Sequence, residues 1–327
     1  MREICISVIM CAYNAEETIS ESVESILEQS FTDFELIIIN DGSIDKTSSI
    51  IGNIKDSRIV LIEQENHGPS IARDNGIKIS KGEYIAILDA DDIALPKRLE
   101  RQINFLKENK EYILVGSNAE VVDKNLEYIY TSCLPLAHND IYNKLPDVPF
   151  FHSAVMFRKN VYQICGGYHT DDKLYIFEDA LLWNQMKEYG KMANLEEPLI
   201  KYRLMPFSAS TKSGKESIIT NNIYKDTIAN KGISEENRKQ LIEFKLATDK
   251  KGRLFNYHMH LSRKYLWNNY SPMKARKNLI LAMKIKPFRI STIILFLMTI
   301  LPKKLILKIH SAKNWFGMDF PHEVCQQ

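Results

Sequence analysis

The feature that most constrains the fold is a regular alternation of apolar, β-branched runs and helix-like segments in the first hundred of the 327 residues. Four runs have the composition of strands that are buried on both faces, at residues 4–11, 34–40, 58–64 and 84–88. Segments with helical periodicity or helix-start residues follow them, at residues 14–27, 46–54, 69–80 and 96–109. Such alternation requires crossover connections, so it predicts an α/β fold with a mostly parallel sheet and helices on both faces.

Start signals accompany three of these helices. Asn14 is expected to cap the first one, with Glu17 as its capping-box partner. Pro69 and Pro96 are expected at the first positions of the third and fourth, because proline suits the start of a helix.

Polar turns follow the predicted strands at residues 12–14, 41–43 and 89–92. The carboxyl ends of parallel strands lie at one edge of a sheet, and α/β proteins bind their ligands there. We therefore expect the three turns to meet in one site. The chain has a mixed pattern from 112 to 205, with one clear helix near 179–189, and it is expected to be helical after residue 215.

Asp89-Ala90-Asp91 is the sharpest local signal. Two carboxylates that end a buried strand cannot face the core cheaply, and hard oxygen ligands suit Mg²⁺ or Mn²⁺ bound together with substrate phosphates. The alternative is structural: Asp91 or Asp92 would favour the positive end of the following helix.

Further polar residues are expected at the same edge. Glu178-Asp179 opens a helix and reads either as an acidic helix start or as a general base. Arg73 could meet a diphosphate, although most helical arginines are solvated. The turn at residues 66–69 precedes a helix and is either an anion seat or an ordinary loop.

The charge is distributed unevenly along the chain. The net charge of +2 combines 29 basic and 39 acidic residues in 1–250 with 14 basic and 2 acidic residues in 251–327. No acid occurs between Lys250 and Met318. A basic block of this size indicates an anionic partner. Phospholipid is favoured over nucleic acid, because no nucleic-acid-binding motif accompanies the charge.

Within the basic block, residues 290–301 form an uncharged apolar run that is too short to span a bilayer. Lysines and an arginine flank it, and Trp315 and Phe316 follow. We interpret residues 285–316 as an anchor that lies in the headgroup region of an anionic membrane. The alternative is a core helix packed against the rest of the protein.

The N-terminal residues and the cysteines bear on the compartment. The segment 1–10 lacks the features of a signal peptide. Five scattered cysteines show no CxxC pair, which argues against a disulfide framework and for a reducing compartment. We expect a cytoplasmic protein that is peripheral on the inner face of the cell membrane.

The motifs in their order resemble family 2 glycosyltransferases, over about residues 4–210. The resemblance is carried by ISVIMCAYNAEETISESVESILEQ, FELIIINDGSIDKT, ENHGPSIARDNGI, GEYIAILDADD and GGYHTDDKLYIFEDALLW. It implies the GT-A fold, a Rossmann-like sheet, and an inverting transferase that uses a nucleotide sugar. A helical basic region would follow this domain.

The resemblance also implies roles for individual residues. The positions that match the donor site are Ala12, Tyr13, Asn14, Asp41, Asn66, Arg73, Asp89 and Asp91. Among them, Asp41 matches the acid that binds the base, Arg73 lies near the diphosphate, and Asp91 matches the ligand of a Mn²⁺ or Mg²⁺ ion. Asp179 matches the catalytic base, with Glu178 and Trp183 on the acceptor side. A single base suffices for an inverting displacement.

The sequence departs from the family pattern at Met205, where many relatives have a histidine that completes the metal shell. A thioether is a poor ligand for a hard cation. The metal would then be held by Asp91, diphosphate and water, or metal dependence would be weak. His152 could substitute, or it could be an ordinary core residue.

These inferences define a domain division and a function. Residues 1–215 would form the transferase domain, with a nucleotide-sugar half at 1–110 and an acceptor half at 111–215, and residues 216–327 the helical region. The enzyme would transfer a hexosyl or N-acetylhexosaminyl group from a UDP-sugar to a polyprenyl-diphosphate-linked glycan in bacterial O-antigen or capsule assembly. The alternatives are a teichoic acid, protein or free saccharide acceptor, and a non-catalytic protein that binds nucleotide sugars.

Overall fold

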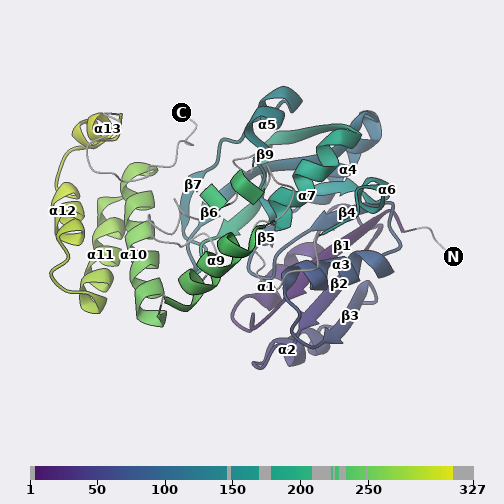
Figure 1. Ribbon diagram of the computed structural model, residues 1–327, viewed down its shortest axis with the longest axis horizontal. Helices are drawn as coiled ribbons and strands as arrows, with labels where there is room; N and C mark the ends of the chain where they lie inside the picture. The colour runs from purple at the N-terminus through teal and green to yellow at the C-terminus, as the bar shows by residue number, and fades with distance from the viewer. Residues whose placement is uncertain are drawn as a thin grey trace. The chain divides into compact units, whose positions relative to one another are not determined.

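The computed structural model describes residues 4–145, 149–168, 178–207, 222–223, 225–227, 233–247 and 249–311. The chain forms two compact units (Figure 1). The first comprises Met1–Glu120 and Cys133–Tyr202, and the second comprises Val121–Ser132 and Arg203–Gln327. The second unit thus includes a segment from the middle of the chain, which the sequence did not indicate. The boundary expected at residue 215 lies outside the described residues and stays a prediction.

A nine-stranded sheet has the order β3-β2-β1-β4-β8-β6-β9-β5, with β7 paired to β6. Four strands of this sheet are mutually parallel: β1 (Ile6–Ala12), β2 (Phe34–Asp41), β3 (Ile59–Gln64) and β4 (Tyr84–Ile87). The other strands are β5 (Ile93–Ala94), β6 (Tyr112–Val122), β7 (Tyr128–Thr131), β8 (Met156–Arg158) and β9 (Lys191–Arg203). β8 is antiparallel to β4 and β6, and β5 is antiparallel to β9. The predicted α/β class is confirmed, and the parallel pairing belongs to the first four strands.

Helices cover both faces of the parallel strands, as the alternation predicted. The helices of this unit are α1 (Ile19–Leu27), α2 (Thr47–Asn53), α3 (Pro69–Ile79), α4 (Arg98–Glu108), α5 (His138–Lys144), α6 (Lys159–Ile164) and α7 (Glu178–Met186). Buried residues of α1, α2 and α4 pack with Val8 and Leu36 in one core cluster. Buried residues of α3, α5, α6 and α7 pack with Ile9 and Ile37 in another. Alternate residues of each strand therefore face opposite layers, as the pleat requires.

Two predicted helix starts are wrong. α1 begins at Ile19 rather than at Asn14, and Asn14 has a left-handed φ of 50° that ends the first strand in a turn. α4 begins at Arg98, and Pro96 lies in the segment between β5 and this helix. The start of α3 at Pro69 is confirmed.

The second unit combines a β-hairpin with helices α9 (Glu235–Ala247), α10 (Lys250–Trp267), α11 (Pro272–Ile285), α12 (Ile290–Met298) and α13 (Lys303–Ser311). Hydrogen bonds join the hairpin to α10: the Tyr265 hydroxyl donates to Asp123 at 3.2 Å, and Lys264 donates to the Tyr130 hydroxyl at 3.0 Å. The predicted helical character is confirmed for these segments. Among the described helices, none is both long and apolar enough to cross a membrane.

The cysteines do not all match the expectation. Cys5, Cys11 and Cys165 are free thiols. Cys133 is disulfide-bonded. One disulfide does not make a framework, but it removes the argument for a reducing compartment that the cysteine pattern had provided.

Candidate active site

The end of β2 holds the loop that follows β3. Both carboxylate oxygens of Asp41 accept backbone N–H groups, from His67 at 2.9 Å and from Gly68 at 2.7 Å. The Asn66 amide donates to the Asp41 carbonyl at 3.0 Å. Gly42 has a φ of 73°, and a Cβ there would lie 2.7 Å from the Asn66 backbone nitrogen. Two of the expected donor residues, Asp41 and Asn66, are therefore in direct contact.

The loop after β1 is tied to the same region. The Asn14 backbone N–H donates to the Ser43 hydroxyl at 2.9 Å, and the Asn14 side-chain oxygen accepts the Ile44 N–H at 2.9 Å. Ala12 is buried, whereas Tyr13 is exposed beside it. Asn14 thus links the turns after β1 and β2, which is a different structural role from the predicted helix cap.

Three hydroxyl groups hold the Asp89–Asp92 turn in place. The Ala90 carbonyl accepts both the Thr18 and the Ser22 hydroxyls of the α1 region at 2.9 Å. The Asp89 N–H donates to the Ser153 hydroxyl at 3.1 Å. Neither Asp91 nor Asp92 caps α4, whose cap position is Lys97 with no side-chain cap bond. Neither acid therefore caps the helix that follows the turn, and Asp91 is half-buried.

Arg73 connects this turn to the start of α7. Its guanidinium donates to Asp89 at 2.7 Å and to Glu178 at 3.2 Å. The Arg73 side chain is only 8% exposed, so it is a buried cation between two carboxylates rather than a solvated surface arginine. The carboxylates belong to segments 89 residues apart in the sequence, which the fold brings to one cation.

The two acids that open α7 have perturbed acidity. Burial raises the pKa of Glu178, and the neighbouring Asp179 raises it further, while Arg73 opposes the shift. Burial also raises the pKa of Asp179, although its carboxylate accepts the Ala180 N–H at 2.7 Å. A carboxylate with a raised pKa is a better proton acceptor than an ordinary one.

The Cys11 thiol shows that the strand ends meet. It lies near the end of β1, and burial raises its pKa to about 12. Arg73 opposes this rise, while Asp41, Asp89 and Glu178 add to it. Charges from the ends of β2 and β4 and from α7 thus act on one thiol at the end of β1. The turns after β2 and β4 and the start of α7 therefore lie within electrostatic range of one thiol. That they form a single ligand site stays a prediction.

His152 and Trp183 are core residues that contact each other near Arg73. The His152 ring lies 2.7 Å from the Tyr168 hydroxyl through Nε2 and makes an edge contact with Trp183. Burial and Arg73 lower the pKa of His152 to about 3, so the ring is neutral at physiological pH. Trp183 is fully buried. Its expected place on the acceptor side stays a prediction.

Few side chains in this region could serve as metal ligands. Among the described residues, no group of three or more His, Cys, Asp or Glu side chains could hold an ion. Asp89 is engaged by Arg73, and the expected role of Asp91 as a metal ligand stays a prediction. This set fits Mg²⁺ or Mn²⁺ only if phosphates complete the shell, as they do for metals bound through one or two carboxylates.

The structure adds residues that sequence reasoning missed. Thr18, Ser22 and Ser153 position the acidic turn, and Tyr168 contacts His152 beside Arg73. Small hydroxyl residues carry little sequence signal, because serine and threonine occur in every kind of segment. Tyr168 follows Gly166-Gly167, two glycines with left-handed φ that could have marked a tight turn.

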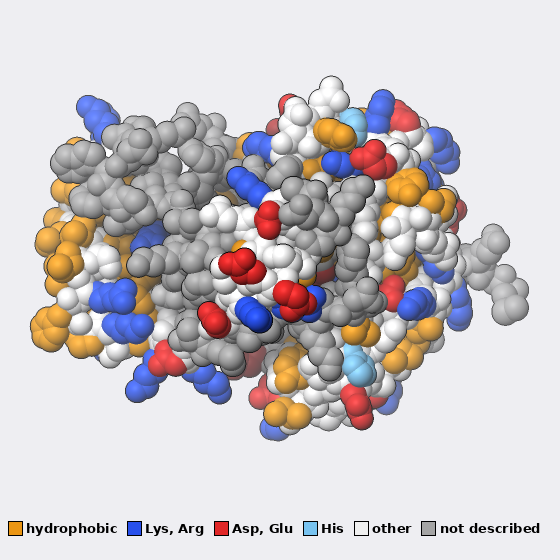
Figure 2. All heavy atoms as spheres, in the orientation of Figure 1, with side chains coloured by type: hydrophobic (Ala, Val, Ile, Leu, Met, Phe, Trp, Pro, Cys, Tyr) orange, Lys and Arg blue, Asp and Glu red, His pale blue; other side chains and the backbone are white. Residues whose placement is uncertain are grey.

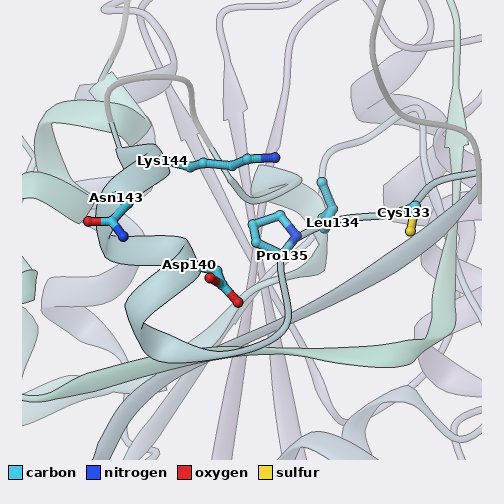
Figure 3. Close-up of a pocket in the computed structure, with 6 residues that line it drawn as sticks. All are labelled: Cys133, Leu134, Pro135, Asp140, Asn143 and Lys144. Atoms are coloured by element: carbon cyan, nitrogen blue, oxygen red, sulfur yellow. The ribbon is translucent and has the colours of Figure 1, made fainter.

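A separate pocket of about 380 Å³ is lined by α5 and the segment before it, through Cys133, Leu134, Pro135, Asp140, Asn143 and Lys144. Figure 3 shows Lys144 extending from α5 across Pro135. None of these lining residues is a predicted site residue, so this pocket is not the cluster around Arg73.

Comparisons with known proteins give the family. Residues 7–166 match the family model for glycosyl transferase family 2. The protein named "Putative glycosyltransferase EpsE" of Bacillus subtilis is 33% identical over 210 residues, which cover 61% of this chain and 72% of that protein. The chain belongs to glycosyl transferase family 2.

Other members of the family align over shorter parts of their length. An uncharacterized glycosyltransferase of Haemophilus influenzae is 37% identical over 216 residues, covering 61% of this chain and 65% of that protein. WfgD of Escherichia coli, a UDP-Glc:alpha-D-GlcNAc-diphosphoundecaprenol beta-1,3-glucosyltransferase, is 38% identical over 126 residues, covering 38% of this chain and 49% of WfgD.

Solved structures confirm the fold. S. aureus TarS residues 1–349 with UDP-GlcNAc superimpose with a TM-score of 0.56 at 16% identity, covering 95% of this chain and 93% of that one. The Pyrobaculum calidifontis mannosyltransferase PcManGT with GDP-Man and Mn²⁺ gives a TM-score of 0.52 at 16% identity, covering 94% and 87%. The predicted GT-A-like α/β class is confirmed.

Proposed function

We propose that this glycosyltransferase is an inverting enzyme that transfers a hexosyl or N-acetylhexosaminyl group from a UDP-sugar to a polyprenyl-diphosphate-linked glycan, in O-antigen or capsule assembly. The observation that carries the proposal is the buried Arg73, which joins the acidic turn after β4 to the acid pair that opens α7. The donor would bind at the turns after β1, β2 and β4. The acceptor hydroxyl would approach from α7.

Each part of this arrangement has a physical task. An inverting displacement needs one proton acceptor on the side opposite the leaving group, and the raised pKa of Asp179 suits that role. The departing diphosphate gains negative charge, which fixed positive charge stabilises. Arg73 is a buried cation that Asp89 and Glu178 hold in place, and it would supply such a charge.

The acceptor and the location are argued from the relatives and the charge. WfgD is named for an acceptor on diphosphoundecaprenol, and this chain is 38% identical to it over 126 residues. A lipid-linked acceptor fits an enzyme that works peripherally at the inner face of the membrane through residues 285–316. The basic block in this part of the chain supports that location.

The test is a panel of UDP-sugars with a short-chain polyprenyl-diphosphate-GlcNAc acceptor and, separately, with a free saccharide, the product anomer being read by NMR. We expect transfer to the lipid-linked acceptor with inversion. Asp179→Asn should lower turnover about 10²- to 10⁴-fold with UDP affinity retained, because a positioned base contributes that much. Glu188→Gln, an exposed acid nearby, is the control.

Three outcomes would contradict parts of the proposal. Retained anomeric configuration removes the single-displacement mechanism. Faster transfer to the free saccharide removes the lipid-linked acceptor. Full function of Asp179→Asn would indicate a protein that binds nucleotide sugars without transferring them.

A divalent metal is part of the proposal, with Asp91 as its protein ligand. When bound, Mn²⁺ or Mg²⁺ supplies positive charge to the diphosphate. The described residues include no group of three or more side chains that could hold a metal ion, so the diphosphate would have to complete the metal's shell. We therefore expect calorimetry to detect Mn²⁺ binding in the presence of UDP and little binding without it. Asp91→Ala should abolish the UDP-dependent binding, and an unchanged titration would remove Asp91 as a ligand.

A further inference from the structure

Helix α12 turns a partly polar face inward. Its buried residues are Thr292 and Leu295, and the buried Thr299 follows its last residue at helical spacing. The Thr292 hydroxyl contacts the Met259 sulfur of α10 at 3.5 Å. Arg276 of α11 donates to the Thr299 hydroxyl at 2.8 Å and to its carbonyl at 3.0 Å. Two threonines thus occupy positions that large aliphatic residues hold in an ordinary surface helix.

The outward face of α12 is apolar. Ile290, Ile293 and Leu297 lie at helical spacing and are 74%, 43% and 58% exposed, and the nearby Ile300 is also exposed. Figure 2 shows hydrophobic side chains gathered over α12, with lysine and arginine side chains beside them. The usual order of a surface helix is reversed here. A contiguous apolar face of this kind marks an interaction surface.

The loop before α12 presents an aromatic residue in the same way. Phe288 is 90% exposed, and its φ of 63° is a conformation that an L-residue adopts at a cost. Its neighbours are held in place, because Lys286 and Arg289 both stack on the Phe255 ring, at 5.3 and 5.4 Å. The backbone is therefore fixed on both sides of a phenylalanine that is left in solvent.

The surrounding charge selects among possible occupants. The helices that precede and follow α12 in the sequence carry exposed lysines, Lys284 in α11 and Lys303, Lys304 and Lys308 in α13. Residues 251–318 contain no acid. A second copy of the chain that docked through this same face would bring the same positive charge and be repelled. An anionic lipid surface complements both the apolar face and the cations.

We propose that α12 lies in the plane of an anionic lipid surface, with Phe288, Ile290, Ile293 and Leu297 inserted below the headgroups. Lys284, Lys303 and Lys304 contact the lipid phosphates. This proposal specifies how the enzyme of the proposed function would bind the membrane. Binding there would bring the enzyme to a lipid-linked acceptor. It stands on observations independent of the active site.

The first experiment is sedimentation of the full chain with vesicles of phosphatidylcholine containing phosphatidylglycerol, and with phosphatidylcholine alone. We expect binding to the anionic vesicles that weakens as salt is raised, because screening reduces the attraction. The triple variant Ile290→Ser, Ile293→Ser, Leu297→Ser should bind at least tenfold more weakly. Ile164→Ser, at an exposed isoleucine of α6, should bind as the unchanged chain does.

A charge-reversal pair separates the electrostatic part. Lys303→Glu with Lys304→Glu should lower binding at least tenfold at low salt, whereas Lys81→Glu with Lys110→Glu, exposed lysines of the first unit, should change it little. Equal losses in the two pairs would show attraction by overall charge and overturn the assignment to this face.

A conservative variant tests insertion even if the triple variant fails to fold. Phe288→Trp should add a tryptophan emission that shifts to the blue on anionic vesicles and is quenched by brominated lipids, while Ile164→Trp should add one that does neither. An added emission at residue 288 that does not respond to vesicles overturns the proposal.

Two readouts keep this inference apart from the proposed function. UDP binding by calorimetry should persist in the triple variant. If the unchanged chain binds UDP but not the anionic vesicles, the membrane surface alone is refuted. If it binds the vesicles but not UDP, the nucleotide site alone is refuted. A chain that dimerises through this face, with the triple variant monomeric and vesicle binding unaffected, would assign the face to a second copy.

Discussion

At the scale of single residues, the site depends on one buried cation. Arg73 lies between Asp89 and Glu178, and its other neighbours include His152, whose pKa it helps to lower. Burying three charged groups is costly unless each is compensated, so removing one partner leaves the others without compensation. The cation also opposes the burial that raises the pKa of Glu178.

Arg73→Met should therefore lower the free energy of unfolding by about 3 kcal/mol at neutral pH, because it leaves two carboxylates unpaired. The loss should shrink at acid pH, where Glu178 can take up a proton. Urea unfolding measures both effects. Arg101→Met is the control, since the Arg101–Glu197 pair is exposed (57% and 46%) and its loss should cost about 1 kcal/mol or less. Similar losses for the two variants would contradict the structural role of Arg73.

Asp179→Asn should stabilise the protein at neutral and alkaline pH while it lowers turnover. Because the folded-state pKa of Asp179 lies above its ordinary value of 3.8, the native state favours the protonated form. That stabilisation is present at low pH and is lost as the pH rises through the folded pKa. Thermal unfolding should show the variant more stable than the unchanged chain at pH 8, with the difference vanishing toward pH 4. A pH-independent difference would show that the carboxylate carries no raised pKa.

At the scale of elements, α1 holds the acidic turn that follows β4. Thr18 and Ser22 both donate to the Ala90 carbonyl, across about seventy residues of sequence. The helix packs on the sheet through Ile19, Val23 and Ile26, so the turn is fixed by the same helix that covers the core. Packing and site geometry are coupled at this point.

The double variant Thr18→Val, Ser22→Ala should cost about 1 to 3 kcal/mol of stability, because the buried Ala90 carbonyl loses both donors. It should also raise the donor KM more than it lowers kcat, since the turn loosens before the donor binds. Ser20→Ala on the same helix, whose exposed hydroxyl donates to Glu24, is the control. A stability loss without a change in KM would separate the turn from donor binding.

At the scale of the whole molecule, the chain order does not follow the two units. Residues 121–132 leave the first unit and pair with helices more than a hundred residues later. The Tyr257 hydroxyl, the Lys264 amine and the Tyr265 hydroxyl all contact this hairpin. The C-terminal helices are thus part of the packing of a segment from the middle of the chain.

A chain that ends at residue 249 should consequently lose cooperative unfolding and become sensitive to proteolysis within 121–132. A chain that ends at residue 286 keeps α10 and α11 and should still unfold cooperatively, at a lower temperature because the contacts of α12 with these helices are lost. It should also retain UDP binding and lose vesicle binding. Thermal circular dichroism and limited proteolysis compare the two, and identical melting of the shorter chain would show that the hairpin folds without α10.

The sequence by itself determined the alternation of strands and helices, the α/β class and the polar turns at strand ends. These follow from local hydrophobic periodicity and turn chemistry, which act over a few residues. It predicted that the turns after β2 and β4 end at one edge of the sheet, because parallel strands do so. The contacts of Arg73 with Asp89 and Glu178 then bring the start of α7 to the turn after β4. It misplaced the start of α1, since Asn14 found partners in Ser43 and Ile44 instead.

Only the tertiary structure decided which charges meet and which faces are covered. Arg73 and Glu178 are 105 residues apart, and no local pattern specifies their contact. The same holds for the hairpin that joins α10 and for the apolar face that α12 leaves in solvent. Such contacts depend on crossover topology and on competition for burial among all segments at once, and the sequence of one segment does not contain that information.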